Sequence, residues 1–119
     1  MEKIGFIGLG AMGKPMANNL IKKGFSLIVF DLFSERTEPL KALGAEGANS
    51  CKEAAERCPI IITMLPSSPD VREAVLGKNG LIEGVRKGSI LIDMSTIDPI
   101  MTRKIEAALK INPNFAEAF

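Results

Sequence analysis

The motif GLGAMG at residues 8–13 constrains the fold of this chain more than any other part of the sequence, because it matches the pattern G-x-G-x-x-G. An apolar run at residues 4–7 precedes it, and residues 11–23 carry apolar side chains at helical spacing. In such a strand–turn–helix unit, the three glycines permit a tight turn, close approach of a ligand and close packing of helix on strand. The motif therefore predicts a helix N-terminus that faces a phosphate group. The residues of this predicted cradle are Gly8, Leu9, Gly10, Ala11, Met12 and Gly13.

The rest of the chain alternates short apolar runs with helical stretches. Strands are predicted at residues 4–7, 27–30, 45–48, 59–65, 89–94 and 114–119, and helices at 11–23, 34–43, 50–57, 68–76 and 96–110. The runs at 59–65 and 89–94 are predicted to be central, buried strands. Because strand and helix alternate, we expect one α/β domain over residues 1–119, of the Rossmann type, with a doubly wound and mostly parallel sheet.

Local signals predict where several helices begin. Ser34 is a candidate N-cap for the helix at 34–43, in which Pro39 is a defect that shortens or kinks the helix. Ser50 and Glu53 have the spacing of a capping box. Ser68 is interpreted as the cap of the helix that follows it.

Asp31 lies at the end of the second predicted strand, eighteen residues after Gly13. A carboxylate at this place can accept hydrogen bonds from the ribose hydroxyls of an adenosine, and it repels a 2′-phosphate. The alternative is a solvated turn residue, which the motif upstream makes the weaker interpretation. Arg36 is a candidate partner for a 2′-phosphate, but because Asp31 is present it is interpreted as a surface helix residue. The sequence therefore predicts NAD as the cofactor, in preference to NADP.

The carboxyl ends of the strands at 59–65 and 89–94 are expected to complete the crevice. Leu65 and Pro66 would form an apolar wall, while Ser67, Ser95 and Thr96 can hydrogen-bond ribose or nicotinamide. For Thr96, helix capping is an equal alternative. No nucleophile–base pair accompanies them, because the sequence has no His and its lysines fall on predicted helix surfaces or loops. No catalytic residue is therefore assigned.

The overall composition excludes several classes of function. A net charge of +1 argues against binding of nucleic acid or of an anionic membrane surface. The apolar runs are too short to span a bilayer, and no targeting leader is recognisable, so a cytoplasmic protein is expected. Cys51 and Cys58 are interpreted as ordinary apolar positions, and without His they are a poor metal set, so neither a disulfide nor a metal site is expected.

Beyond its glycines, the segment GLGAMGKPMANNLIKKG at residues 8–24 resembles the extended cofactor motif of β-hydroxyacid dehydrogenases. The segments VFDLF (29–33), IITMLPSS (61–68) and LIDMSTIDP (91–99) are similar to 3-hydroxyisobutyrate dehydrogenases. The resemblance implies an NAD-dependent oxidoreductase of valine catabolism that interconverts 3-hydroxyisobutyrate and its semialdehyde. It also implies cofactor contacts at Leu65, Pro66, Asp70 and Thr96, with Ser95 near the substrate. Asp70 stands where mammalian relatives have Asn, which leaves that contact open.

The resemblance also implies parts that this sequence does not contain. Members of the family continue into a substrate-binding segment and an all-helical domain that carries the catalytic lysine, so we expect the chain alone to be inactive. Loss of that domain would expose apolar side chains near the strand predicted at 114–119, and a homo-oligomer is therefore expected. A mitochondrial matrix location is the alternative for an animal source. Two other functions stay open: a sister enzyme acting on tartronate, glyoxylate or succinic semialdehyde, and a non-catalytic dinucleotide-binding module.

Overall fold

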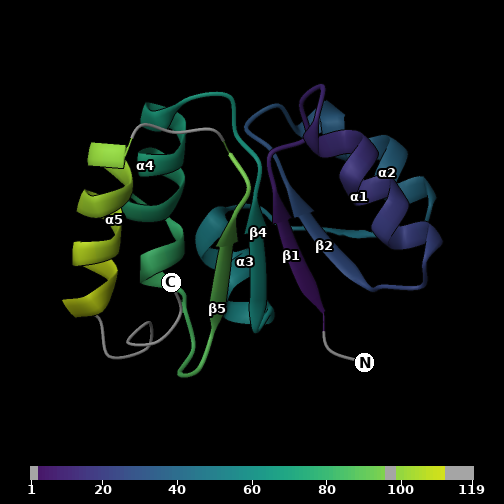
Figure 1. The fold of residues 1–119 in the computed structure, drawn as a ribbon. Coiled ribbons are helices and arrows are strands. Elements are labelled where there is room, and N and C mark those ends of the chain that lie inside the picture. The colour runs from purple at the N-terminus through teal and green to yellow at the C-terminus, as the bar shows by residue number, and fades with distance from the viewer. Residues whose placement is uncertain (1–2, 96–98, 112–119) are drawn as a thin grey trace.

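Five short parallel strands form a single sheet in the computed structural model, which describes residues 3–95 and 99–111 (Figure 1). Their order is β3-β2-β1-β4-β5, which is the arrangement of a Rossmann-type sheet, so the predicted fold class is confirmed. The strand predicted at 114–119 lies outside the described residues. The strands are β1 (Ile4–Ile7), β2 (Leu27–Phe30), β3 (Glu46–Gly47), β4 (Ile60–Thr63) and β5 (Ile90–Asp93).

Helices cover both faces of this sheet, with α1 and α2 on one side and α3 on the other (Figure 1). The α-helices are α1 (Gly13–Lys22), α2 (Glu38–Ala42), α3 (Cys51–Arg57), α4 (Ser68–Leu76) and α5 (Pro99–Ile111). Two short 3-10 helices, η1 (Ser34–Thr37) and η2 (Leu81–Glu83), lie between them. None of the helices in the described ranges has the length and apolarity needed to cross a bilayer.

Side chains that alternate along the strands divide the core in two. Phe6 of β1 and Val29 of β2 pack in the cluster beneath α1 and α2, whereas Ile7 and Ile28 pack in the cluster with α3, α4 and α5. Consecutive residues of these strands are buried because successive side chains point to opposite faces, and both faces are covered. This is why the strands are continuous apolar runs in the sequence.

Two predicted details of the helices are wrong. The segment predicted as one helix at 34–43 is divided into η1 and α2, and Ser34 makes no side-chain cap. Pro39 falls in the first turn of α2, where its missing N–H costs no hydrogen bond. The cap of α4 is Ser67 and not Ser68, because Ser67 is the extended residue whose Oγ accepts from the N–H of Asp70 at 3.4 Å.

The position of β5 also differs from the prediction. Within the described residues it is the edge strand of the sheet, paired with β4 alone, and not a central strand. Ile90 and Ile92 are consequently 47% and 42% exposed on one face, while Leu91 is buried on the other. An apolar run in the sequence does not reveal whether a strand has one neighbour or two.

Candidate cofactor site

A cavity of about 700 Å³ lies at the carboxyl ends of β1, β2 and β4, where the strand order reverses between β1 and β4. The glycine motif, the segment after β2, the start of α3 and the start of α4 all contribute to its wall. The structure therefore brings together segments that are distant in the sequence. The predicted site residues that line the cavity are Gly8, Gly10, Ala11, Met12, Gly13, Asp31, Leu65, Pro66 and Asp70.

The three glycines of the motif have distinct structural roles. Gly8 has φ of +100°, and a Cβ there would overlap the carbonyl oxygen of Met64 at the end of β4. A Cβ on Gly13 would overlap the carbonyl oxygen of Gly8, so this glycine is needed for the close approach of α1 to β1. A Cβ on Gly10, by contrast, would have only the Nη1 of Arg36 within reach, at 4.0 Å. The space over Gly10 is therefore open to the cavity.

The N-terminus of α1 is electrostatically suited to an anion. Its N-cap position, Met12, supplies no side-chain hydrogen bond, and the first turn carries no acidic residue. The first N–H groups and the positive end of the helix dipole are thus not neutralised by a local side chain. Residues 10–13 line the cavity, so this helix terminus faces it.

Asp31 is held rigidly just beyond β2. Its Oδ2 accepts from the backbone N–H of Leu9 at 2.7 Å, and its Oδ1 accepts from the N–H of Phe33 at 2.9 Å. The residue is only 9% exposed. A carboxylate has about four acceptor positions, so two remain for hydroxyl groups. Leu9 itself is buried and does not line the cavity; its contribution is the N–H that orients Asp31.

Arg36 lies closer to the site than its interpretation as a surface residue suggested. Its Nη1 is 3.6 Å from the Oδ1 of Asp31, and its guanidinium carbon lies 4.6 Å from the centre of the Phe33 ring. Both Arg36 and Phe33 line the cavity. Its contact with Asp31 was not predicted, because η1 turns the side chain back toward β2, a direction that a prediction of one continuous helix at 34–43 does not give.

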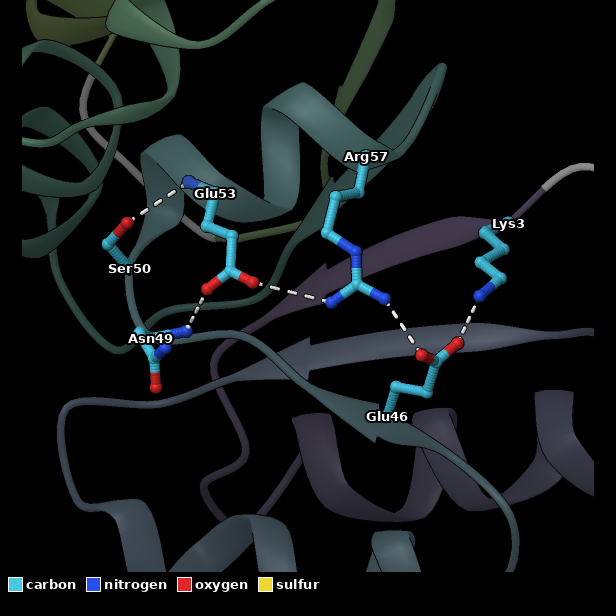
Figure 2. Close-up of polar contacts among 6 residues, drawn as sticks. All are labelled: Lys3, Glu46, Asn49, Ser50, Glu53 and Arg57. Atoms are coloured by element: carbon cyan, nitrogen blue, oxygen red, sulfur yellow. Dashed lines mark hydrogen bonds and ion pairs between the residues drawn. The ribbon is translucent and has the colours of Figure 1, made fainter.

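The start of α3 forms another wall of the cavity and is fixed by a chain of polar contacts (Figure 2). The N–H of Glu53 donates to the Oγ of Ser50 at 3.0 Å, which confirms Ser50 as the N-cap. The Glu53 carboxylate does not return to Ser50 but accepts from the N–H of Asn49 at 2.7 Å. Asn49, Ser50 and Cys51 all line the cavity, and none was predicted to do so.

The same carboxylate connects α3 to the sheet. Arg57 lies between Glu53 and Glu46, with nitrogen–oxygen distances of 3.4 Å and 2.8 Å, and Glu46 also pairs with Lys3 (Figure 2). We call these four residues the β3 ion-pair cluster. Hydrogen bonds from Lys3 and Arg57 hold the pKa of Glu46 below its ordinary value. The cluster joins α3, β3 and the residue before β1, and so orients the helix whose first turn borders the cavity.

The ends of β4 and β5 meet through side chain to backbone contacts. The backbone N–H of Leu65 donates to the Oγ of Ser95 at 2.7 Å, so Ser95 holds the apolar wall in place without lining the cavity. Asp70 does line it, and its Oδ2 accepts from the Oγ of Ser67 at 2.8 Å. Thr96 lies outside the described residues, and its two predicted roles stay predictions.

The far end of the cavity is formed by residues that were not predicted as site residues. Glu73 and Ala74 of α4 and the loop of Lys78, Asn79 and Gly80 contribute to it. Asn79 has φ of 58°, in the left-handed region that a residue other than glycine rarely adopts. This backbone conformation marks the loop as unusual, and it is visible only in the structure.

The two cysteines behave as apolar residues, as predicted. Both are buried and free. Burial raises the pKa of the Cys51 thiol to about 12 and that of Cys58 to about 11. Although Cys51 borders the cavity, neither thiol is ionised near neutral pH, so neither is an effective nucleophile.

Comparison with known proteins is consistent with this geometry. The chain is 49% identical over 102 residues to the mitochondrial 3-hydroxyisobutyrate dehydrogenase of Mus musculus, an overlap of 86% of this chain and 30% of that protein. It is 43% identical over 110 residues to the NAD-dependent L-serine dehydrogenase of Pseudomonas aeruginosa, covering 92% of this chain and 37% of that protein. The chain thus spans about a third of the length of these relatives.

The solved structure of Mycobacterium tuberculosis 3-hydroxyisobutyrate dehydrogenase with L-serine is similar over 95% of this chain and 38% of its own, with a TM-score of 0.84 and 31% identity. A family model described as the NAD binding domain of 6-phosphogluconate dehydrogenase matches residues 3–114. The open glycine cradle and the oriented carboxylate of Asp31 fit that description. The chain therefore belongs to the family of NAD-binding domains that this model defines, within a group of relatives that includes 3-hydroxyisobutyrate dehydrogenases.

Proposed function

We propose that this chain is the cofactor-binding part of an NAD-dependent dehydrogenase that oxidises a small 3-hydroxy acid, 3-hydroxyisobutyrate in the first instance, to its semialdehyde. The observation that carries the proposal is the open space over Gly10, at an uncapped helix N-terminus and in the same cavity as Asp31. A pyrophosphate would lie against residues 10–13, and a ribose would donate its hydroxyl protons to Asp31.

The remaining predicted contacts follow from this orientation. Leu65 and Pro66 would pack against the nicotinamide half and exclude water from it, and Asp70 would accept hydrogen bonds at the start of α4. Ser95 would lie toward the substrate, where its hydroxyl already orients the N–H of Leu65. Bound NAD would supply the hydride acceptor, and these residues would hold it in position.

Within the substrate class, two acids share the reacting group. The relatives in mouse and Pseudomonas aeruginosa are named for 3-hydroxyisobutyrate and for L-serine. Both compounds carry a primary alcohol two carbons from a carboxylate, so one arrangement of the nicotinamide can serve either. L-serine is therefore the second candidate. In any longer protein that contains this chain, parallel measurement of kcat/KM for the two acids would decide between them.

We infer that the 119-residue chain binds NAD but does not by itself catalyse the oxidation of a hydroxy acid. The sequence has no His, and the described cavity wall offers only carboxylates, Arg36 and Lys78 as ionisable groups besides Cys51. Isothermal titration calorimetry should give one NAD per chain, while NADH absorbance should stay at the enzyme-free level with either acid. Absence of NAD binding would refute the proposed function. Sustained NADH production would refute the inactivity, and Lys78→Met would then test that lysine as the proton carrier.

Two further proposals concern the compartment and the oligomeric state of the protein. We infer a cytoplasmic protein, or a matrix protein if the source is an animal, an alternative that the name of the mouse relative supports. We also keep the prediction of a homo-oligomer, which light scattering over a range of concentrations tests. A mass of one chain at every concentration would refute it.

A further inference from the structure

The last residues of β4 and β5 are joined by their side chains as well as by the strand pairing. Thr63 and Asp93 are partners in the register of the two strands, and the Oγ1 of Thr63 donates to the Oδ1 of Asp93 at 2.9 Å. Thr63 is fully buried, so the carboxylate supplies the acceptor that its hydroxyl needs. Neither residue lines the cavity, and the proposed cofactor contacts give Asp93 no role.

The same carboxylate oxygen also holds Ser95. The N–H of Ser95 donates to the Oδ1 of Asp93 at 3.0 Å, and the Oγ of Ser95 accepts from the N–H of Leu65 at 2.7 Å. Leu65 lies two residues after Thr63, so these contacts close on themselves. We call Thr63, Asp93, Ser95 and Leu65 the strand-end ring. A backbone hydrogen bond from the N–H of Met94 to the carbonyl oxygen of Thr63, at 2.8 Å, completes the connection.

The strand-end ring determines how close Leu65 lies to the glycine motif. A Cβ built on Gly8 would be 2.8 Å from the Cδ2 of Leu65, so this side chain lies directly over the turn. Of the four ring residues, Leu65 alone lines the cavity. Its backbone is held by Ser95, and Ser95 is held by Asp93. A displacement of Ser95 would therefore move the apolar wall without changing any residue of the wall.

We infer that Asp93 is a positioning residue for the nicotinamide half of the cofactor and that it acts through Ser95. One oxygen of Asp93 accepts from two donors, one in β4 and one in the segment after β5, and this fixes the hydroxyl that holds Leu65. The wall is then ordered before the ligand arrives, so binding loses less conformational entropy. This inference rests on the proposed function, because it requires the nicotinamide half to pack against Leu65.

The test compares NAD with ADP-ribose, which lacks only the nicotinamide ring. Both are titrated calorimetrically against the parent chain, Asp93→Ala, Asp93→Asn, Ser95→Ala and the double variant of Asp93→Ala with Ser95→Ala. Ser89→Ala is the matched control. Ser89 is buried directly before β5, at the opposite end of the strand from Ser95, and its Oγ accepts from the N–H of Arg86 at 3.1 Å. It does not line the cavity.

Asp93→Ala should weaken NAD by about tenfold, the effect of losing a hydrogen bond to a charged group, and ADP-ribose by less than about threefold. Asp93→Asn should bind NAD within about threefold of the parent, because the amide oxygen can accept from both donors. Ser95→Ala should show the same selective loss as Asp93→Ala. The control should bind both ligands like the parent chain.

The double variant separates positioning through Ser95 from two independent effects. If Asp93 acts through Ser95, the double variant should weaken NAD by no more than about tenfold, like each single variant. Independent contributions would instead multiply to about 100-fold. A melting temperature within a few degrees of the parent shows that a change in affinity is not a loss of folding.

Two failures have different meanings. If the parent chain does not bind NAD, the proposed function is overturned and this inference falls with it. If NAD binds but Asp93→Ala weakens both ligands equally, or the double variant loses about 100-fold, the inference alone is overturned. If Asp93→Ala does not fold, Asp93→Glu takes its place, because it keeps the charge and displaces the oxygen by one carbon atom. The same selective loss of NAD is then expected, and an unchanged NAD affinity would overturn the inference.

Discussion

Replacement of Gly10 by valine separates the cofactor site from the fold. A Cβ at this position would meet no atom closer than the Nη1 of Arg36, at 4.0 Å. Its φ also lies outside the left-handed region that only glycine adopts readily. The free chain therefore has room for the Cβ, and we expect the free energy of unfolding to change by less than about 1 kcal/mol.

The effect on NAD should be large, because the added methyl groups occupy the space that the pyrophosphate needs. If the displaced phosphates lose two hydrogen bonds from helix N–H groups, each worth about 1.5 kcal/mol, the loss is about 3 kcal/mol, or roughly 100-fold in affinity. Calorimetric titration of NAD measures this loss, and thermal unfolding of the same sample measures the fold.

Gly13→Ala is the matched control for this experiment. Its smaller side chain would overlap the carbonyl oxygen of Gly8, so it should lower the melting temperature strongly although it adds only one carbon atom. An NAD affinity of Gly10→Val within about threefold of the parent would show that the cradle does not bind the pyrophosphate. Equal destabilisation by the two variants would show that Gly10 has a structural role instead.

Three further predictions concern the surroundings of the cavity. Ser50→Ala should reduce the free energy of unfolding by about 1 kcal/mol in urea titrations, because the N–H of Glu53 loses its cap; an unchanged midpoint would show that the cap contributes nothing. The pKa of Glu46 is lower in the folded chain than its ordinary value of 4.5. Its charged form therefore stabilises the fold fully at pH values above 4.5, and this contribution disappears as the pH falls through the lowered pKa. Glu46→Gln should therefore weaken the acid-side pH dependence of the melting temperature, and parallel curves for variant and parent would contradict this. With pKa values raised to about 12 and 11, Cys51 and Cys58 should react with a thiol reagent at neutral pH only after denaturant is added; rapid labelling of the native chain would refute their assignment as buried apolar positions.

The sequence by itself determined the features that depend on near neighbours in the chain. The motif at residues 8–13 predicted a strand, a turn and a helix, and β1 and α1 occur there. The β-branched and aromatic run at 27–30 predicted β2, and Asp31 follows it directly. Ser50 was recognised as a cap because its partner, the N–H of Glu53, is three residues away. These signals are local, so hydrogen bonding within a few residues decides them.

Choices between adjacent residues were less certain even at this range. Ser67 and Ser68 are equally good caps by residue type, and the backbone after β4 decides in favour of Ser67, which is extended. In the same way, Pro39 predicted a break in a helix, but the structure puts the break before Glu38, where the proline fits the first turn of α2.

Only the tertiary structure decided which distant segments meet at the cavity. The sheet order places β4 beside β1, and this brings Leu65 to the glycine motif across more than fifty residues of sequence. The β3 ion-pair cluster likewise joins α3, β3 and the residue before β1. The pairing of Asp31 with Arg36 spans only five positions, yet it depends on η1 replacing a regular helix and on the ring of Phe33 beneath the guanidinium. Contacts of this kind arise from strand pairing and from the packing of helices on the sheet. The hydrophobic pattern specifies that such packing occurs, but not which polar side chains it brings together.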